Sequence, residues 1–241
     1  MDLIIPGVIY AENGSVVRMQ SFTITGGKAT QVCLYVSGTL MVISTNVTTC
    51  SSSGNGGMLY SEGGITTLQG GTISLSSAQG YGGVVYSNGN TVKINSAVMT
   101  NNVANSGGAV YIHQGNAMLS SCIFLNNNAS MQGGSVYNSA GSVIVLISVF
   151  NSTGSDVLFS SGSLIQSGNT FTLSGQGTIE TINGASIVSN ERYTQASSQP
   201  VIRMTQGGAI VRDSSFTNTA NLQTTLSDGS STMITSNLTL N

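Results

Sequence analysis

Residues 107–111 read Gly-Gly-Ala-Val-Tyr, residues 133–137 read Gly-Gly-Ser-Val-Tyr, and this recurrence decides the fold. The closing tyrosine belongs to a series with a nearly constant step: Tyr10, Tyr35, Tyr60, Tyr86, Tyr111 and Tyr137. An aliphatic residue precedes each tyrosine, and a glycine pair precedes four of these dipeptides. A repeat of roughly 25 residues with strand-forming segments and glycine turns predicts a solenoid.

A second series of apolar residues runs beside the tyrosines, with steps that become shorter after Phe150: Phe22, Val47, Ile73, Met99, Phe124, Phe150, Phe171, Tyr193, Phe216 and Leu238. The segments around its members alternate and are rich in Val, Ile, Thr and Tyr, which indicates strands. We therefore predict an all-β, single-stranded parallel solenoid of about ten coils, each with three short strands, that stack at about 4.8 Å per coil.

The chain is predicted to form one repeat domain over residues 1–241. Residues 1–160 hold the regular coils, and residues 161–241 hold shorter, less regular ones with a loop at 191–200 that leaves the stack. Solenoids need polar capping units for solubility. Because residues 3–5 and 238–240 are mostly apolar, we expect either that the chain is a segment of a longer protein or that neighbouring chains cover both ends.

Two kinds of corner are predicted. The glycine pairs mark one corner, where a positive φ or a close backbone approach excludes a Cβ atom. Asparagines mark another, because asparagine tolerates the left-handed backbone better than most residues. Those that follow the second series closely are Asn101, Asn102, Asn126, Asn127, Asn128, Asn151 and Asn218.

The alternation of a strand also predicts which way the tyrosines point. If the aliphatic residue before each tyrosine faces the core, the tyrosine faces outward. The resulting strip of stacked tyrosines has two interpretations, which the residues leave open. It forms a lateral contact with another chain or a saccharide, as contiguous apolar patches do, or its rings stabilise the strands by about 0.5–1.5 kcal/mol per pair.

Composition excludes some classes of partner. Only 6% of residues are charged, the net charge is -2, and the six cations are scattered. No basic stripe could neutralise phosphates, so nucleic acid is not expected as a partner. No stretch approaches the roughly 18 apolar residues of a spanning helix, so no membrane span is expected.

Cysteines and sequons bear on the compartment. Three cysteines leave at least one unpaired or bonded to another chain, and they serve as packing residues or form a local bridge. In a secreted protein, five N-x-S/T sequons would accept glycans, although a chain rich in these residues also produces them by chance: Asn13, Asn46, Asn128, Asn151 and Asn237.

Two passages resemble a known repeat. Residues 97–111 and 122–137 are similar to the FxxN and GGA[IV] repeats of polymorphic outer membrane proteins and related surface proteins. Gly207-Gly208-Ala209-Ile210 with Phe216-Thr217-Asn218 is a partial third match, and the resemblance covers much of residues 10–160. It implies a right-handed, pectin-lyase-like parallel β-helix in secreted adhesive or structural proteins.

Catalytic patterns are not evident, and we expect no enzyme activity, cofactor or metal. Glycoside hydrolysis needs paired carboxylates, but the acids are dispersed: Asp2, Glu12, Glu62, Asp156, Glu180, Glu191, Asp213 and Asp228. The single histidine, His113, has no neighbours spaced like a catalytic triad. A threonine array that would suit ice binding is broken in the middle coils by Ser74, Leu125 and Asn151.

The sequence thus favours a noncatalytic extracellular structural protein, a building block of a filament or surface assembly that associates end to end and laterally. The main alternative is an adhesin segment of a larger cell-surface or virion protein, with glycans or host surface proteins as partners. A polysaccharide-processing enzyme is the lesser alternative.

Overall fold

The computed structural model describes residues 2–5, 9–26, 32–152, 158–173, 179–182, 184–195, 202–205, 207–217 and 231–235. These residues form strands, turns and bends, and none of them lies in a helix. Each strand pairs in parallel with its equivalent in the next coil, as Val85 and Tyr86 do with Val110 and Tyr111. The all-β parallel stack predicted from the repeat is confirmed.

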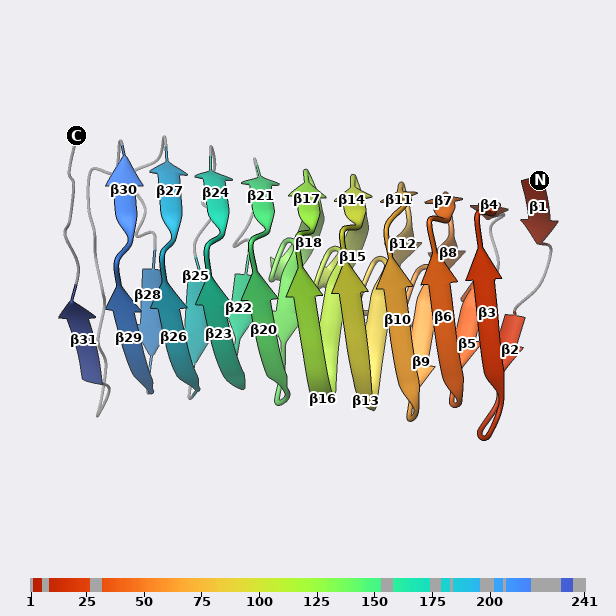
Figure 1. The fold of residues 1–241 in the computed structure, drawn as a ribbon, viewed down its shortest axis with the longest axis horizontal. Helices are drawn as coiled ribbons and strands as arrows, with labels where there is room; N and C mark the ends of the chain where they lie inside the picture. Colours follow the sequence, from red (N-terminus) through yellow and green to blue (C-terminus); the bar gives the residue numbers. More distant parts are fainter. Residues whose placement is uncertain are drawn as a thin grey trace.

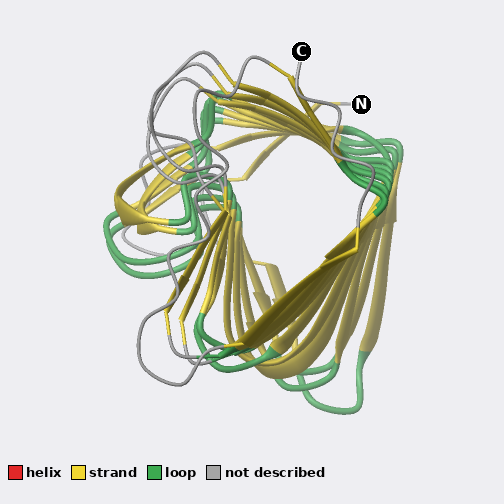
Figure 2. Cartoon of the chain, turned by 90° about the vertical axis from the view of Figure 1, so that its left-hand side faces the viewer, coloured by secondary structure: helices red, strands yellow, loops and turns green. Residues whose placement is uncertain are grey.

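The winding is right-handed. In Figure 1, strands such as β3 (Val16–Gln20) run up the near side and strands such as β5 (Leu34–Val36) run down the far side. Between them the chain advances from its N-terminal end on the right to its C-terminal end on the left. The molecule is a right-handed parallel β-solenoid, and Figure 2 shows its three walls along the axis.

Face 1 carries the tyrosines. Its strands are β2 (Ile9–Ala11), β5, β9 (Leu59–Glu62), the first parts of β13 (Val85–Asn95) and β16 (Val110–Ser120), β19 (Val136–Asn138), β22 (Leu158–Ser160), β25 (Ile179–Ile182) and β28 (Ile202–Thr205).

Face 2 follows face 1 in each coil and has longer strands. They are β3, β6 (Thr39–Ile43), β10 (Ile65–Gln69), the second parts of β13 and β16, β20 (Ser142–Leu146), β23 (Ser163–Ser167), β26 (Ala185–Ser189), β29 (Gly208–Arg212) and β31 (Ser231–Thr235). Faces 1 and 2 belong to one sheet of 17 strands because β13 and β16 continue around the corner.

Face 3 closes each coil as a sheet of ten strands: β1 (Asp2–Ile5), β4 (Thr23–Gly26), β7 (Asn46–Thr48), β11 (Thr72–Ser74), β14 (Val98–Thr100), β17 (Ile123–Leu125), β21 (Val149–Ser152), β24 (Thr170–Leu173), β27 (Arg192–Gln195) and β30 (Ser215–Thr217). A side sheet links face 3 to the next face 1: β8 (Ser51–Ser52), β12 (Ser77–Ala78), β15 (Val103–Ser106) and β18 (Asn128–Gln132).

The number of coils differs slightly from the prediction. Fewer than ten turns are complete within the described residues, because gaps such as 153–157, 174–178 and 218–230 interrupt the later coils. The change of coil length is confirmed by the register on face 3. Phe124 pairs with Phe150 and Phe150 pairs with Phe171, so the second of these coils is the shorter one.

The second apolar series lines the core side of face 3 from Val47 to Tyr193, with one correction at its start. Ile24, and not Phe22, pairs in register with Val47. Ile24 is fully buried, whereas Phe22 precedes the strand and is only partly buried. The later members of the series form an inner stack of rings, with centroids 4.7–5.0 Å apart: Phe124, Phe150, Phe171 and Tyr193. Leu238 lies outside the described residues.

The glycine pairs occupy the corner before face 1 for both of the predicted reasons. In the pair Gly82-Gly83, Gly82 has a φ of 69°. A Cβ atom on Gly83 would lie 2.1 Å from the carbonyl oxygen of Gly108 in the next coil. The first glycine therefore supplies the backbone conformation, and the second lets adjacent coils approach.

The asparagine corner is confirmed for four residues. Asn101 and Asn126 have φ angles of 55° and 49°. The residues that follow them, Asn102 and Asn127, are buried, and Nδ2 of Asn102 donates to Oδ1 of Asn127 at 2.9 Å. The other predicted members lie in strands or outside the described residues: Asn128, Asn151 and Asn218.

The loop predicted at 191–200 is wrong over its first half. Residues 192–195 form β27, which pairs with β24 and β30. Glu191 and Tyr193 are each only 1% exposed, because strand alternation turns Tyr193 into the core and Asn169 bonds the carboxylate of Glu191. Residues 196–200 lie outside the described residues.

One disulfide closes part of a coil. Cys33 before β5 bonds to Cys50 after β7, with Cα atoms 6.1 Å apart. Cys122 is a buried free thiol, and burial raises its pKa to about 11. The local bridge that the sequence left open thus forms between the first two cysteines, and the third is a packing residue.

Candidate functional site

The six predicted tyrosines form one ladder on the outer side of face 1. The aliphatic residues before them on β5 to β19 are fully buried, as the alternation predicts. Successive ring centroids from Tyr10 to Phe159 lie 4.7–5.5 Å apart, and all the pairs are stacked except the tilted pair of Tyr10 and Tyr35. The structure therefore brings Tyr10, Tyr35, Tyr60, Tyr86, Tyr111 and Tyr137 together in one row.

The row is not a uniform surface. Tyr10 is 54% exposed, whereas Tyr86 and Tyr111 are 7% exposed. Tyr81, in the connection from the side sheet to face 1, stacks on Tyr111 with ring centroids 4.7 Å apart. The chain itself covers the middle of the strip, and the spacing of the repeat gave no signal of this cover because Tyr81 lies outside the series.

Stacking also decides which part of each ring is available. Rings that face their neighbours along the axis present edges and hydroxyl groups outward. A saccharide that packs on a ring face thus finds no free face within the stack. This geometry favours mutual stabilisation of the strands, and the predicted contact with another chain or a saccharide stays a prediction.

The ladder raises the pKa of five tyrosine hydroxyls: Tyr35, Tyr60, Tyr86, Tyr111 and Tyr137. The Tyr35 hydroxyl donates to Oε2 of Glu62 at 3.0 Å, and this bond raises the pKa of Tyr35. Burial raises the pKa of Tyr86 to about 12. His113 stacks beside the same ladder, with its ring centroid 6.4 Å from that of Tyr86. Over the described residues no group of three or more His, Cys, Asp and Glu side chains could hold a metal ion.

A buried polar row lies inside the corner between faces 2 and 3. The Ser148 backbone N–H donates to Oδ1 of Asn169 at 2.7 Å, and the Asn169 backbone N–H and Nδ2 donate to the Glu191 carboxylate at 2.8 and 2.9 Å. The Glu191 N–H donates in turn to Oγ of Ser214. Burial raises the pKa of Glu191 to about 8.

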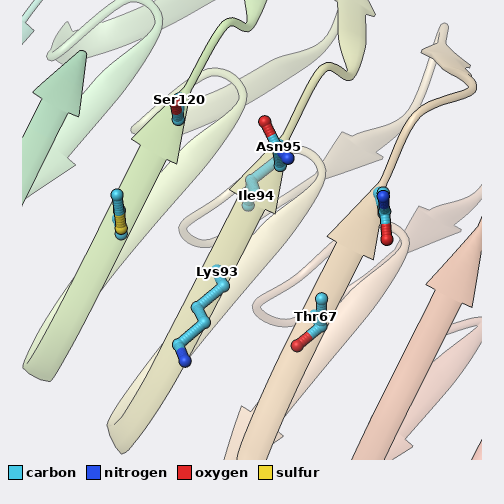
Figure 3. A pocket seen from close by; sticks show the side chains of 7 residues that line it. Thr67, Lys93, Ile94, Asn95 and Ser120 are labelled. Carbon is cyan, nitrogen blue, oxygen red and sulfur yellow. The ribbon is translucent and has the colours of Figure 1, made fainter.

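Face 2 carries a shallow groove of about 250 Å3. Figure 3 shows Lys93 between Thr67 on one neighbouring strand and Ser120 on the other, with Asn95 near the strand end. The groove offers one ammonium group, two hydroxyls and two amides, and the side chains of Ile94 and Met118 make much of its surface apolar. Its lining includes no acid and no histidine or cysteine.

Sequence analysis missed an aliphatic row on the outer side of face 2. The row consists of residues at the centre of successive face 2 strands, paired in register: Met118, Ile144, Ile165, Ile187 and Ile210. The signal was present in the sequence, since an aliphatic residue stands at the middle of each strand between buried residues. This signal was hard to recognise because apolar residues such as Val143 and Val145 stand beside the outward residue, so the alternation of inward and outward positions is not visible as apolar and polar residues.

Four of the five predicted glycan acceptors are exposed, two of them on face 3 (Asn46 and Asn151), one in the side sheet and one in a turn: Asn13, Asn46, Asn128 and Asn151. Asn13 lies in a turn, whereas Asn46 lies in β7 and accepts a hydrogen bond from the Thr72 N–H at 3.0 Å. Asn237 lies outside the described residues. Their glycosylation stays a prediction.

The chain matches no protein-family model, no curated protein and no solved structure. The parallel β-solenoid therefore stands on the structure, and the finer resemblance to polymorphic-outer-membrane-protein repeats and pectin-lyase-like proteins stands on the motifs alone. No helix in the described ranges is long and apolar enough to cross a membrane.

Proposed function

We propose that this protein is a noncatalytic structural building block of an extracellular filament or surface assembly. The observation that carries the proposal is the pair of stacked aromatic ladders, one outside face 1 and one inside face 3, with centroids no more than 5.5 Å apart. Rows of stacked rings resist bending and shear between coils, as a rigid rod requires.

An oxidising compartment agrees with the Cys33–Cys50 disulfide, because structural disulfides persist mainly in secreted proteins. The exposed sequons and a surface with few charges favour the same setting. The resemblance of residues 97–111 and 122–137 to repeats of secreted surface proteins supports the extracellular assignment, and it brings with it the pectin-lyase-like form of the fold.

Two of the described acids have structural partners, which favours a noncatalytic role. Glu191 is buried and accepts a hydrogen bond from Asn169, and Glu62 accepts one from the Tyr35 hydroxyl. Both bonds come from neutral donors, whereas glycoside hydrolysis needs two carboxylates that flank one bond. Turnover of a polysaccharide would support the enzyme alternative if replacement of one acid abolished that turnover.

The adhesin alternative has one observation in its favour, the shallow groove on face 2 in which Lys93 places an ammonium group beside hydroxyl and amide side chains. In that case glycans or host surface proteins would be the partners. Glycan-array binding that is lost in Lys93→Ala would support it, whereas the building-block role predicts no such binding.

Electron microscopy of the native material tests the proposal. We expect rods in which the strand repeat of about 4.8 Å runs on between subunits. Isolated short particles at all protein concentrations would overturn the building-block role.

A further inference from the structure

The aliphatic row of face 2 lies on a surface that the described part of the chain leaves partly exposed. Met118 is 41% exposed and Ile210 is 38% exposed at its two ends, and the three isoleucines between them are partly exposed. The residues on either side of these isoleucines along each strand, such as Val143 and Val145 beside Ile144, are buried. The row is thus the outward half of a strict alternation.

The surroundings of the row are neutral and mostly small. Residues 116–120, 142–146, 163–167 and 185–189 contain no charged residue. Serines flank the row along the strands, among them Ser120, Ser142, Ser163 and Ser167. The nearest cations on the face lie at its borders, Lys93 one strand before Met118 and Arg212 on the strand of Ile210. A central apolar ridge with a polar rim is the usual anatomy of a protein contact.

We propose that a second copy of this chain packs on the row, face 2 against face 2. The face 2 strands of Met118, Ile144, Ile165 and Ile187 carry no charged residue, and Arg212 lies at the rim of the patch, so the centre of the contact buries no unpaired charge. The row lies at the centre of each strand, so a two-fold axis in the contact plane brings row against row. Two flat sheets packed in this way lie about 10 Å apart, as in a β-sandwich.

The area of the patch sets the strength of the contact. Five strands about 4.8 Å apart, each with five positions at about 3.3 Å, cover roughly 400 Å2 per copy. Two copies bury roughly 800 Å2, below the roughly 1,200–2,000 Å2 of stable complexes. The pairing is therefore weak and concentration-dependent, and it is suited to copies crowded in the assembly proposed above, on which this inference rests.

Sedimentation equilibrium with a triple variant tests the pairing. In Ile144→Thr with Ile165→Thr and Ile187→Thr, each threonine keeps the β-branched shape that strands favour. We expect the dissociation constant to rise at least about tenfold, because the apolar area is lost. The matched control makes the same kind of change on the outer side of face 3: Val98→Thr, Ile123→Thr and Val149→Thr. Its dissociation constant should stay close to that of the unchanged protein.

Cross-linking gives a second measurement that does not depend on the triple variant folding. Ile165 is the middle residue of the row, and at the sheet spacing of about 10 Å two facing cysteines are too far apart for a direct disulfide. A short bis-maleimide should therefore join two copies of Ile165→Cys, whereas Ile123→Cys on face 3 should not be joined. Unchanged sedimentation of the triple variant, or equal cross-linking by both cysteine variants, would overturn the inference.

Failure of the pairing is distinguishable from failure of the proposed function. Rods in the microscope from a protein that shows no face 2 cross-link would leave the structural role standing and remove this contact. Polysaccharide turnover by an isolated chain would remove the structural role without altering the measured dissociation constant.

Discussion

The long coils and the short coils of this solenoid carry different rows of stacked aromatic rings. The outer row on face 1 belongs mainly to the long coils and runs from Tyr10 to Phe159, with Tyr81 from the side-sheet connection stacked on Tyr111. The inner row on face 3 begins at Phe124 and continues through the short coils, where Phe171 and Tyr193 are no more than 1% exposed. The register of the outer row continues beyond Phe159 with Glu180 and Arg203.

The difference shows how coil length and ring placement are connected. An aromatic ring inside a coil is already enclosed by the three faces, so its burial requires no additional residues. A ring on the outer side gains comparable burial only if additional residues fold over it. The long coils contain such residues in the side sheet, which accounts for their greater length.

The largest effect should come from breaking the inner stack of the short coils. Phe171→Ala removes a fully buried ring between Phe150 and Tyr193, and we expect a loss of about 3–5 kcal/mol in the free energy of unfolding. Tyr60→Ala, at a partly exposed ring of the long coils, should lose under about 2 kcal/mol. Urea unfolding of both variants measures the two values, and equal losses would contradict the contrast.

A glycine change breaks the corner that is peculiar to the long coils. In Gly108→Ala the new Cβ would lie 2.1 Å from the Gly134 carbonyl oxygen, and we expect a loss of about 2–3 kcal/mol from the forced separation of coils. The control is Gly54→Ala, whose Cβ would meet only Oγ of Ser52 at 3.8 Å. Thermal melting should leave the control near the unchanged protein, and a matching drop in both would refute the explanation.

The short coils should respond to pH through Glu191. Because burial raises its pKa from 4.5 to about 8, the folded protein favours the neutral acid. This contribution to stability is complete below about pH 4.5 and is lost as pH rises toward 8, by up to about 1.4 kcal/mol per pH unit.

Glu191→Gln should flatten that dependence, since an amide keeps the size of the side chain without ionising. Its single oxygen can accept only one of the two hydrogen bonds from Asn169, so the variant is less stable at every pH. Urea unfolding at several pH values from 4.5 to 8.5 compares the two proteins. Parallel curves would mean that the Glu191 carboxyl is not the group that titrates.

The smallest effect belongs to the exposed outer hydroxyls. Tyr35→Phe removes the bond to Glu62 but keeps the ring stack, so we expect a loss of about 0.5–1 kcal/mol. Glu62→Gln serves as the partner variant in a double-mutant cycle. A loss as large as that of Tyr60→Ala would show that the hydroxyl, and not the ring, stabilises the ladder.

The sequence predicts the strands of the middle coils better than the residues at the two ends of the apolar series. Tyr86 and Tyr111 fell into register because the glycine pair and the aliphatic residue before each of them repeat with the coil. Phe22 was assigned wrongly because an aromatic residue before a strand has the same spacing as one within it. The segment from Glu191 was read as a loop because its charges suggested a surface, although Asn169 bonds the carboxylate in the core.

The sequence by itself determined the repeat, the strand character of each segment and the parallel stack, since period, alternation and glycine turns are local properties. Only the tertiary structure decided which row of outward side chains is exposed to solvent and which is covered by another segment. Tyr111 is covered by Tyr81 from the side-sheet connection, whereas Met118 on the same strand stays open. An outward side chain is buried only when another segment of the protein folds over its strand. The repeating pattern of the strand itself contains no information about that segment.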